Sequence, residues 1–323
     1  MAWKVYNADK FDNFRKEWDQ LNKNGPDSPV YNSAFITYSL REFGNGNERL
    51  AVYGDLHNPS AMTVLNKTKF GVWDTFQPSQ VPLGAWLTNQ KTEVRVLLKE
   101  LMRALPGLVL KIGLTQQDPA IYPRPDDQGP ISTLDYIQTA RIEISESFEE
   151  YWASRGKNLR HNLKRQRNRL NKEEINLKLK VIRQAELVRQ AIADYGNMES
   201  AGWKASEGTA ISLGNAQGRF YTALLEEFCA RQQGCIYQYF YDDQMVATDL
   251  CIIQNGVLVI LKTTYDESIS TSSPAFLMRQ EAFEKIFSSG DIRAIEFYGK
   301  LMDWHTKWSN ESRMLYHINY TKF

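Results

Sequence analysis

The chain has 323 residues, of which 42% are hydrophobic and 12% aromatic, and its formal net charge is +1. This composition is sufficient for buried cores throughout and excludes an intrinsically disordered chain. A net charge near zero excludes a general electrostatic attraction to nucleic acid or to a membrane surface, so any such attraction must be local. No run approaches the ~18 apolar residues of a membrane span, so the sequence predicts a cytoplasmic protein.

The three cysteines, Cys229, Cys235 and Cys251, are odd in number and lack the spacing of metal ligands. Reduced thiols in an intracellular protein are the simplest interpretation of this pattern. The sequence therefore predicts neither a disulfide framework nor a metal site.

The first 130 residues are typical of an α+β domain. Apolar residues at helical spacing predict helices over residues 9–22, 34–43 and 92–105. Short apolar runs predict strands at residues 50–53, 61–65, 69–76 and 108–112. This half contains no recognisable catalytic constellation.

Residues 117–133 contain four of the eleven prolines in the chain. Such a density disfavours regular structure and indicates a linker or crossover between domains. We therefore predict an N-terminal domain over residues 1–130 and a C-terminal domain over residues 131–323.

The second domain begins with a clear pattern. An alternating strand at residues 138–144 precedes Ser147 and Glu150, which form a capping box for a long helix reaching residue 172. Further helices are predicted at residues 185–198, 218–232 and 303–308, and one begins at Pro274. Further strands are predicted at residues 175–181, 236–241, 245–253, 257–264, 294–298 and 314–321.

The connection from the strand at residues 257–264 to the helix at Pro274 contains the best candidate for a binding site. Ser273 is a good N-cap, because its hydroxyl can accept from the open amides of the first turn, and Pro274 suits the first helical position. The small side chain of Ala275 leaves those amides uncovered. A helix N-terminus after a buried strand can bind phosphate or pyrophosphate, although an ordinary strand–loop–helix unit with a good cap explains the same residues.

The order of elements in the second domain resembles the GNAT acyltransferase fold. Short sequence motifs along the chain also resemble the CelD-type branch of that superfamily, which is associated with cellulose and polysaccharide synthesis and is related to FemAB-like transferases. The residues that carry this resemblance are Trp18, Leu21, Tyr38, Phe43, the basic segment 158–165, the segments 202–204 and 208–209, Phe220, Tyr221, Tyr265, Asp266, Ser273, Pro274, the segment 297–299, Lys307 and Trp308.

The resemblance implies an α+β protein with two GNAT-like α/β domains in tandem, each a mixed, mostly antiparallel sheet flanked by helices. It also implies an N-acyltransferase that uses acetyl-CoA or another acyl-CoA. The acceptor amine, for example on an amino sugar or sugar nucleotide in polysaccharide or cell-envelope metabolism, would attack the thioester directly. The N-terminal domain would be degenerate and contribute to the acceptor side.

The resemblance also implies which residues bind the substrates. In GNAT proteins the helix after the third hairpin strand binds the donor pyrophosphate, which corresponds here to Thr264, Ser272, Ser273, Pro274, Ala275, Phe276 and Leu277. The family usually has Ser-Pro-Gly at the helix start, where this chain has Ala275 in place of the glycine. Candidate acceptor-side residues are Trp203, Lys204 and Tyr265, although Trp203 is equally explained as a packing anchor.

Three residues are candidates for acid–base chemistry. Asp249 lies in the apolar strand at residues 245–253, and a buried carboxylate is either paired or more basic than in water, which suits a general base. A hydrogen-bonded structural aspartate is an equally good interpretation. Asp266 is the second candidate acid. The resemblance to GNAT enzymes implies that Tyr298 protonates the leaving thiolate, although a core tyrosine explains the same residue.

The segment from residue 155 to residue 172 has eight lysines and arginines and no acid. A solvated helix face explains most such runs. A run of one sign, however, lacks the opposite charges that support a helix, which favours an anionic partner. Arg160, Lys164 and Arg167 share one face and could hold phosphates, an acidic glycan or a carrier protein; tRNA ranks lower without a wider basic surface.

Two other functions remain open. A FemAB-like transferase would keep the fold but take aminoacyl-tRNA as the donor. A non-catalytic GNAT-fold protein would bind coenzyme A without releasing a thiol. Comparing the binding of acetyl-CoA with the binding of tRNA distinguishes an acyl-CoA-dependent enzyme from the first alternative. Measuring turnover distinguishes it from the second.

Overall fold

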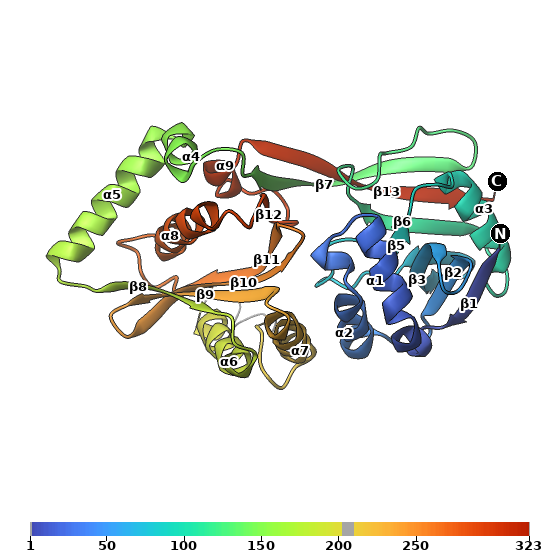
Figure 1. Ribbon diagram of the computed structural model, residues 1–323, viewed down its shortest axis with the longest axis horizontal. Helices are drawn as coiled ribbons and strands as arrows, with labels where there is room; N and C mark the ends of the chain where they lie inside the picture. The colour runs from blue at the N-terminus through green and yellow to red at the C-terminus, as the bar shows by residue number, and fades with distance from the viewer. Residues whose placement is uncertain (1, 202–209, 323) are drawn as a thin grey trace. The chain divides into compact units, whose positions relative to one another are not determined.

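The computed structural model describes residues 2–201 and 210–322 (Figure 1). It contains two compact units, one made of Met1–Thr139 with Arg313–Phe323 and the other of Ala140–Ser312. Each unit has a mostly antiparallel arrangement of strands flanked by helices.

Two strands carry the chain from one unit to the other. Strand β7 (Ile131–Glu143) leads from the first unit into the second, and β13 (Glu311–Thr321) returns. The sequence placed the division after residue 130 and gave the closing strand to the second domain. In the structure β13 pairs with β6 (Lys111–Gln117), with Tyr316 opposite Gln117, and this pairing groups most of β13 with the first unit.

The strands of the first unit follow the order β1-β2-β3-β4-β6-β13, with β5 paired to β3. The β4–β6 pair is parallel, and the pairs among β1, β2, β3, β4 and β5 are antiparallel. The first five strands are β1 (Trp3–Asn7), β2 (Arg49–Gly54), β3 (Pro59–Lys69), β4 (Val72–Thr75) and β5 (Trp86–Thr88).

The helices of the first unit lie where the apolar spacing predicts them, except the short 3-10 helix at Pro29–Tyr31, which was not predicted. They are η1 (Ala8–Phe14), α1 (Arg15–Asn24), η2 (Pro29–Tyr31), α2 (Ser33–Phe43) and α3 (Val94–Ala104). The helix predicted over residues 9–22 is a 3-10 turn followed by an α-helix. The indole of Trp18 is fully buried and donates to the carbonyl of Tyr31 over 2.6 Å, which ties α1 to η2.

The strands of the second unit follow the order β7-β12-β11-β10-β9-β8. Only the β11–β12 pair among them is parallel, as expected when a helix connects two strands. The strands are β8 (Leu177–Ile182), β9 (Gly234–Tyr241), β10 (Gln244–Gln254), β11 (Val257–Tyr265) and β12 (Ala294–Glu296).

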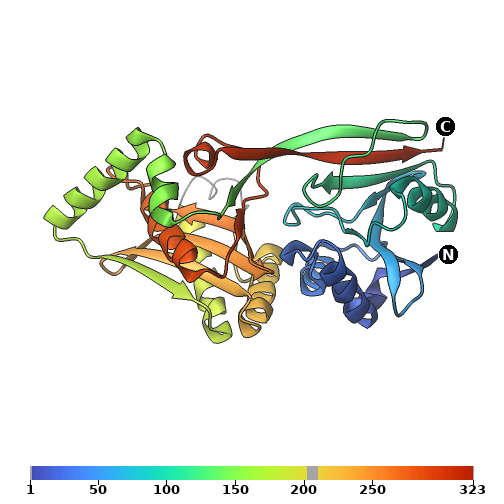
Figure 2. The ribbon, with the colours of Figure 1, turned by 45° about the horizontal axis from the view of Figure 1, so that its top comes forward.

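Helices cover both faces of these strands. Figures 1 and 2 show α6 and α7 on one face and α8 on the other. The helices are α4 (Phe148–Ser154), α5 (Lys157–Lys172), α6 (Ala185–Ala201), α7 (Ala216–Ala230), α8 (Pro274–Ser289) and α9 (His305–Trp308).

The predicted capping box of Ser147 and Glu150 is confirmed, but the single long helix after it is wrong. Arg155 and Gly156 are extended, with ψ of 155° and 133°, so α4 ends and α5 begins in a new direction. The guanidinium of Arg155 donates to the carbonyl of Trp308 and to the hydroxyl of Ser154, which holds the break in place.

Trp308 is the centre of the aromatic packing beside α8. It is fully buried, and its ring contacts the rings of Trp152, Phe276 and Phe283 at centroid distances of 5.9, 5.6 and 5.1 Å. Burial of rings of this size is a large source of stability. The short helix α9 therefore fixes the N-terminal half of α8 against α4.

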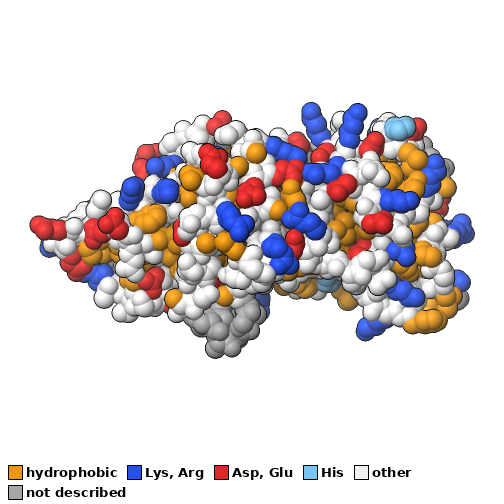
Figure 3. Space-filling view, turned by 90° about the horizontal axis from the view of Figure 1, so that it is seen from below, with side chains coloured by type: hydrophobic (Ala, Val, Ile, Leu, Met, Phe, Trp, Pro, Cys, Tyr) orange, Lys and Arg blue, Asp and Glu red, His pale blue; other side chains and the backbone are white. Residues whose placement is uncertain are grey.

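On the face shown in Figure 3, basic and acidic side chains are interspersed, as expected for a net charge of +1. In the part of the chain that the structure describes, no helix is both long enough and apolar enough to span a bilayer.

Candidate active site

Two cavities of the second unit meet at the N-terminus of α8. The first, which we call the α8 cavity, has a volume of about 840 Å³ and lies among the end of β11, the start of α8 and α6. The second, the α5 cavity, has a volume of about 740 Å³ and lies among α5, α8 and α9. Ser273 and Phe276 line both cavities.

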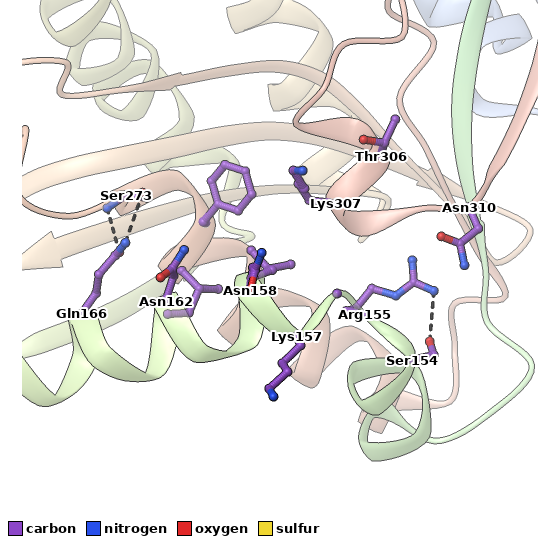
Figure 4. Close-up of a pocket in the computed structure, with 14 residues that line it drawn as sticks. Ser154, Arg155, Lys157, Asn158, Asn162, Gln166, Ser273, Thr306, Lys307 and Asn310 are labelled. Atoms are coloured by element: carbon purple, nitrogen blue, oxygen red, sulfur yellow. Dashed lines mark hydrogen bonds between the residues drawn. The ribbon is translucent and has the colours of Figure 1, made fainter.

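The structure revises the predicted N-cap of α8. Pro274 occupies the first helical position, as predicted, but the hydroxyl of Ser273 makes no capping bond. It is directed to Gln166 of α5, whose side-chain oxygen also accepts from the Ser273 amide over 2.9 Å (Figure 4). Among the described residues, nothing accepts from the Ala275 amide, so this N–H remains available at the positive end of the helix dipole.

The residues assigned to the donor lie close together. Thr264, Ser272, Ser273, Ala275 and Phe276 line the α8 cavity, as does Tyr265 from the acceptor-side set. The structure places Pro274 and Leu277 in the buried interior. Five of the seven residues that the sequence predicted for the donor therefore line the cavity, while Pro274 and Leu277 are not part of the lining.

Asp249 forms a buried ion pair with Arg279 of α8. Both residues are 3% exposed, and the carboxylate oxygens lie 3.2 Å from Nε and from one terminal nitrogen of the guanidinium. Arg279 lines the α8 cavity, whereas Asp249 lies behind it in β10. This pairing is the structural alternative that the sequence left open, and Asp249 is absent from the lining of the α8 cavity, where a general base would meet the acceptor.

Arg279 is held by three groups in all. It also donates to the Thr263 hydroxyl over 2.6 Å, and its guanidinium carbon lies 4.3 Å from the centre of the Trp304 ring. Sequence reasoning missed this residue. Its only signal was one arginine in the helical stripe that also contains Phe276 and Phe283, where a cation is buried only when it is paired.

The other two acid–base candidates do not line the α8 cavity. Asp266 accepts from the side chain of Gln244 and from the amide and hydroxyl of Ser268, in a turn beside a separate surface hollow. Tyr298 is buried two residues after the end of β12, with a positive φ of 49°. A non-glycine residue is rarely held in this conformation, so the backbone there is fixed by its surroundings.

Glu199 is the buried carboxylate of the α8 cavity. It lies near the end of α6 and is 3% exposed. One oxygen accepts from the Ile211 amide over 2.8 Å, and the other lies 3.4 Å from the Lys262 ammonium. The sequence did not single out this residue, because one glutamate on an amphipathic helix has no distinguishing pattern.

Lys262, the partner of Glu199, lies between two aromatic rings. Its ammonium is 5.9 Å from the ring centre of Tyr195 and 5.8 Å from that of Tyr221. Burial raises the pKa of both tyrosines, so both phenols are protonated and can only donate or accept neutral hydrogen bonds. The Tyr195 hydroxyl donates to the carbonyl of Thr263, which joins this cluster to β11.

The remaining substrate-side residues fall into two groups. Trp203 and Lys204 lie outside the described residues. Arg160 and Lys164 are on α5, where Arg160 donates to the carbonyl of Arg155 and Lys164 is exposed. Arg167, predicted on the same face, instead pairs with Glu281 of α8 over 2.5 Å, so it holds the two helices together.

His305 provides a prediction on pH. Its Nδ1 accepts from the Met302 amide over 2.9 Å, and burial together with the nearby Arg279 cation lowers its pKa from 6.5 to about 4. Because the unfolded chain binds this proton at a higher pH than the folded chain, the free energy of unfolding should fall as the pH drops from 6.5 towards about 4. Denaturation midpoints at about pH 7.5 and about pH 5 should differ less in His305→Asn than in the wild type.

The exposed residue His161 on α5 provides the control for this experiment. His161→Asn should keep the wild-type dependence of stability on pH. An unchanged dependence in His305→Asn would mean that other groups account for it.

The strongest comparison concerns the unit that contains both cavities. Residues 157–306 match the family model described as an acetyltransferase (GNAT) domain. This stretch is a GNAT acetyltransferase domain. The protein is therefore an acyltransferase, and the predicted α+β fold of tandem GNAT-like units is confirmed. The CelD-type branch stays a prediction, and no curated protein matches the sequence.

Several solved structures share the fold across both units. The C-terminal domain of a putative lysylphosphatidylglycerol synthetase from Agrobacterium fabrum has a TM-score of 0.61 at 11% identity, covering 96% of this chain and 92% of that one. L-PGS from Bacillus licheniformis has a TM-score of 0.55 at 14% identity, covering 95% and 91%. FemX has a TM-score of 0.55 at 8% identity, covering 99% and 97%.

Proposed function

We propose that this GNAT domain transfers an acyl group from an acyl-CoA to an amine in the α8 cavity. The observation that carries the proposal is the open N-terminus of α8 beside that cavity. In the reaction the amine nitrogen forms a bond to the thioester carbonyl carbon, and the carbon–sulfur bond breaks. Coenzyme A leaves as a thiolate and is protonated, while the amine loses a proton to a base. No covalent enzyme intermediate is needed, so positioning supplies most of the catalysis.

The start of α8 supports the placement of the donor. Its first turn contains no acid, and its second residue, Ala275, has an amide without a partner among the described residues. A helix end of this kind attracts the charge of a pyrophosphate. The thioester would then lie along the end of β11, near Thr264 and Tyr265.

The residues beyond the donor support an amine as the acceptor. Glu199 and Glu267 both line the α8 cavity, and carboxylates attract a cationic amine before it loses its proton. We propose Glu199 as the base, because it is buried and lines the cavity itself, whereas Asp249 lies behind it. The exposed part of the Trp304 ring offers an apolar surface such as sugar rings pack against. An amino sugar or sugar nucleotide of polysaccharide or cell-envelope metabolism is the acceptor class we propose.

A second donor class, aminoacyl-tRNA, is favoured by one observation. The side of α5 with Lys164, Arg165 and Lys172 lines a surface hollow of about 600 Å³ with no acid among its described lining residues. A phosphate backbone binds such a surface through its charge. The proposal of acyl-CoA predicts stabilisation by acetyl-CoA, whereas this alternative predicts salt-dependent binding of tRNA and no stabilisation by acetyl-CoA.

Acetyl-CoA is expected to stabilise the protein by roughly 2.7 kcal/mol at a hundredfold excess over its dissociation constant. Ser273→Asp should remove most of this stabilisation, because a carboxylate at the start of α8 repels the pyrophosphate. The variant should fold normally, since an acid at a helix N-terminus is itself favourable. A thermal shift assay with and without acetyl-CoA measures both effects.

Ser147→Asp is the matched control. It adds the same charge at the N-cap of α4, a serine that lines neither cavity. Full stabilisation of Ser273→Asp by acetyl-CoA would place the pyrophosphate elsewhere. No stabilisation of the wild type by acetyl-CoA or by longer acyl-CoAs would contradict acyl-CoA as the donor.

A further inference from the structure

We infer that the α5 cavity is a second anion site, which binds a phosphate ester of the donor apart from the pyrophosphate at α8. The inference rests on the proposed function only in assigning the phosphate to the donor. The two cavities share Ser273 and Phe276, so one ligand can occupy both.

Two helix N-termini open onto the α5 cavity. Gly156 is the N-cap of α5 and Ser273 is the N-cap of α8, and both line the cavity. Neither makes a side-chain capping bond, and neither helix has an acid in its first turn. The unpaired amides and the dipoles of two sixteen-residue helices therefore favour negative charge at this point. A Cβ on Gly156 would contact nothing within 4 Å, so a ligand can approach the backbone there.

Arg155 is the independent observation that points to a ligand. It lines the cavity and is only 8% exposed. Its two terminal nitrogens donate to the carbonyl of Trp308 over 2.9 Å and to the hydroxyl of Ser154 over 3.0 Å. Its Nε is buried and has no hydrogen-bond partner among the described residues. A buried donor is rarely left unpaired, and an anion in the cavity would accept from it.

The charge around the cavity is not balanced from within. Arg155 and Lys307 are its cations, and its described lining contains no aspartate or glutamate. Elsewhere on α5, by contrast, Arg167 and Arg169 pair with Glu281 and Glu173. Cations without an acid beside them favour an anionic ligand in this cavity over a neutral or cationic one.

Asn158 and Asn162 provide the cleanest way to test the site. Figure 4 shows both amides projecting from α5 towards α8 and α9, whereas the side chain of Lys157 is directed away. Both asparagines are exposed. Asn158 is the second residue of α5, where an aspartate is favourable for the helix. Asn158→Asp therefore adds a repulsive charge to the cavity without endangering the fold.

The experiment is a calorimetric titration of the full chain with inorganic pyrophosphate, coenzyme A, 3′-dephospho-coenzyme A and unfractionated tRNA. In Asn158→Asp and Asn162→Asp we expect the affinity for coenzyme A to fall about tenfold or more, because the added carboxylate repels the 3′-phosphate in the α5 cavity. Asn171→Asp, at the other end of α5 and in the lining of neither the α5 cavity nor the basic hollow, should bind coenzyme A like the wild type.

The other probes identify the source of the phosphate. If the wild type prefers coenzyme A to its dephospho form and Asn158→Asp loses this preference, the cavity holds the 3′-phosphate. If only tRNA binding is weakened, the site stands and acyl-CoA as the donor is contradicted. If the wild type binds coenzyme A and neither variant changes the affinity for any probe, the second anion site is wrong while the proposed function stands.

Discussion

Asp249→Asn should lower the free energy of unfolding by about 3–5 kcal/mol, because removing one partner of a buried ion pair leaves the other charge unpaired. The charge that would be left without its carboxylate is the guanidinium of Arg279, which is 3% exposed. Its remaining contacts to the Thr263 hydroxyl and the Trp304 ring are with neutral groups and cannot compensate for the lost carboxylate. Chemical denaturation of the purified variant measures the change directly.

Glu143→Gln is the matched control for this measurement. Glu143 also pairs with an arginine of the second unit, Arg141, but its side chain is 53% exposed. Surface pairs of this kind contribute between 0 and about 1 kcal/mol, so this variant should be close to wild type. If Asp249→Asn instead kept its stability and lost acyl transfer about a hundredfold, as loss of a general base does, Asp249 would be that base after all.

Glu199→Gln is expected to reduce the rate of acyl transfer on the order of a hundredfold or more, as loss of a general base does. The amide oxygen of glutamine can still accept from the Ile211 amide, so the end of α6 keeps its anchor. Lys262 keeps its contact with the side chain of Gln217 and with the two tyrosine rings. Stabilisation by acetyl-CoA should therefore remain, and comparing it with turnover separates lost chemistry from lost folding.

Glu267→Gln provides the comparison within the same cavity. Glu267 also lines the α8 cavity, but it is exposed, so its loss should affect acceptor binding more than the rate at saturation. Equal and small losses of turnover in both variants would mean that a water molecule takes the proton. An unfolded Glu199→Gln, shown by loss of the acetyl-CoA shift, would make the residue structural.

Patterns of a few neighbouring residues were sufficient to predict the elements that short-range interactions stabilise. The capping box at Ser147 and the start of α8 at Pro274 were predictable, because caps and fixed backbone angles are properties of a few neighbouring residues. The break at Gly156 was not predictable in this way, since the contact that stabilises it joins Arg155 to Trp308, far along the chain.

The candidate site was predictable only in part, for the same reason. The sequence identified the strand–helix connection that lines the α8 cavity, but it assigned Ser273 a local capping bond that Gln166 of α5 replaces. It also placed Asp249 correctly inside a buried strand and could not find its partner. Arg279 lies thirty positions later, on a helix that packs across the strand. The hydrophobic pattern of a strand is the same whether its buried carboxylate has a partner or not.

The return of β13 to the first unit has a consequence for synthesis on the ribosome. The first unit is not contiguous, so the nascent chain must emerge through the whole second unit before β6 receives its neighbour β13. Until then Asp118, which is 1% exposed in the complete structure, also lacks the two bonds it accepts from Arg313. An open strand edge and a buried acid that still lacks its arginine both disfavour early folding. The second unit can therefore fold before the first unit is complete. This reverses the usual order of folding during synthesis, in which the N-terminal domain folds first.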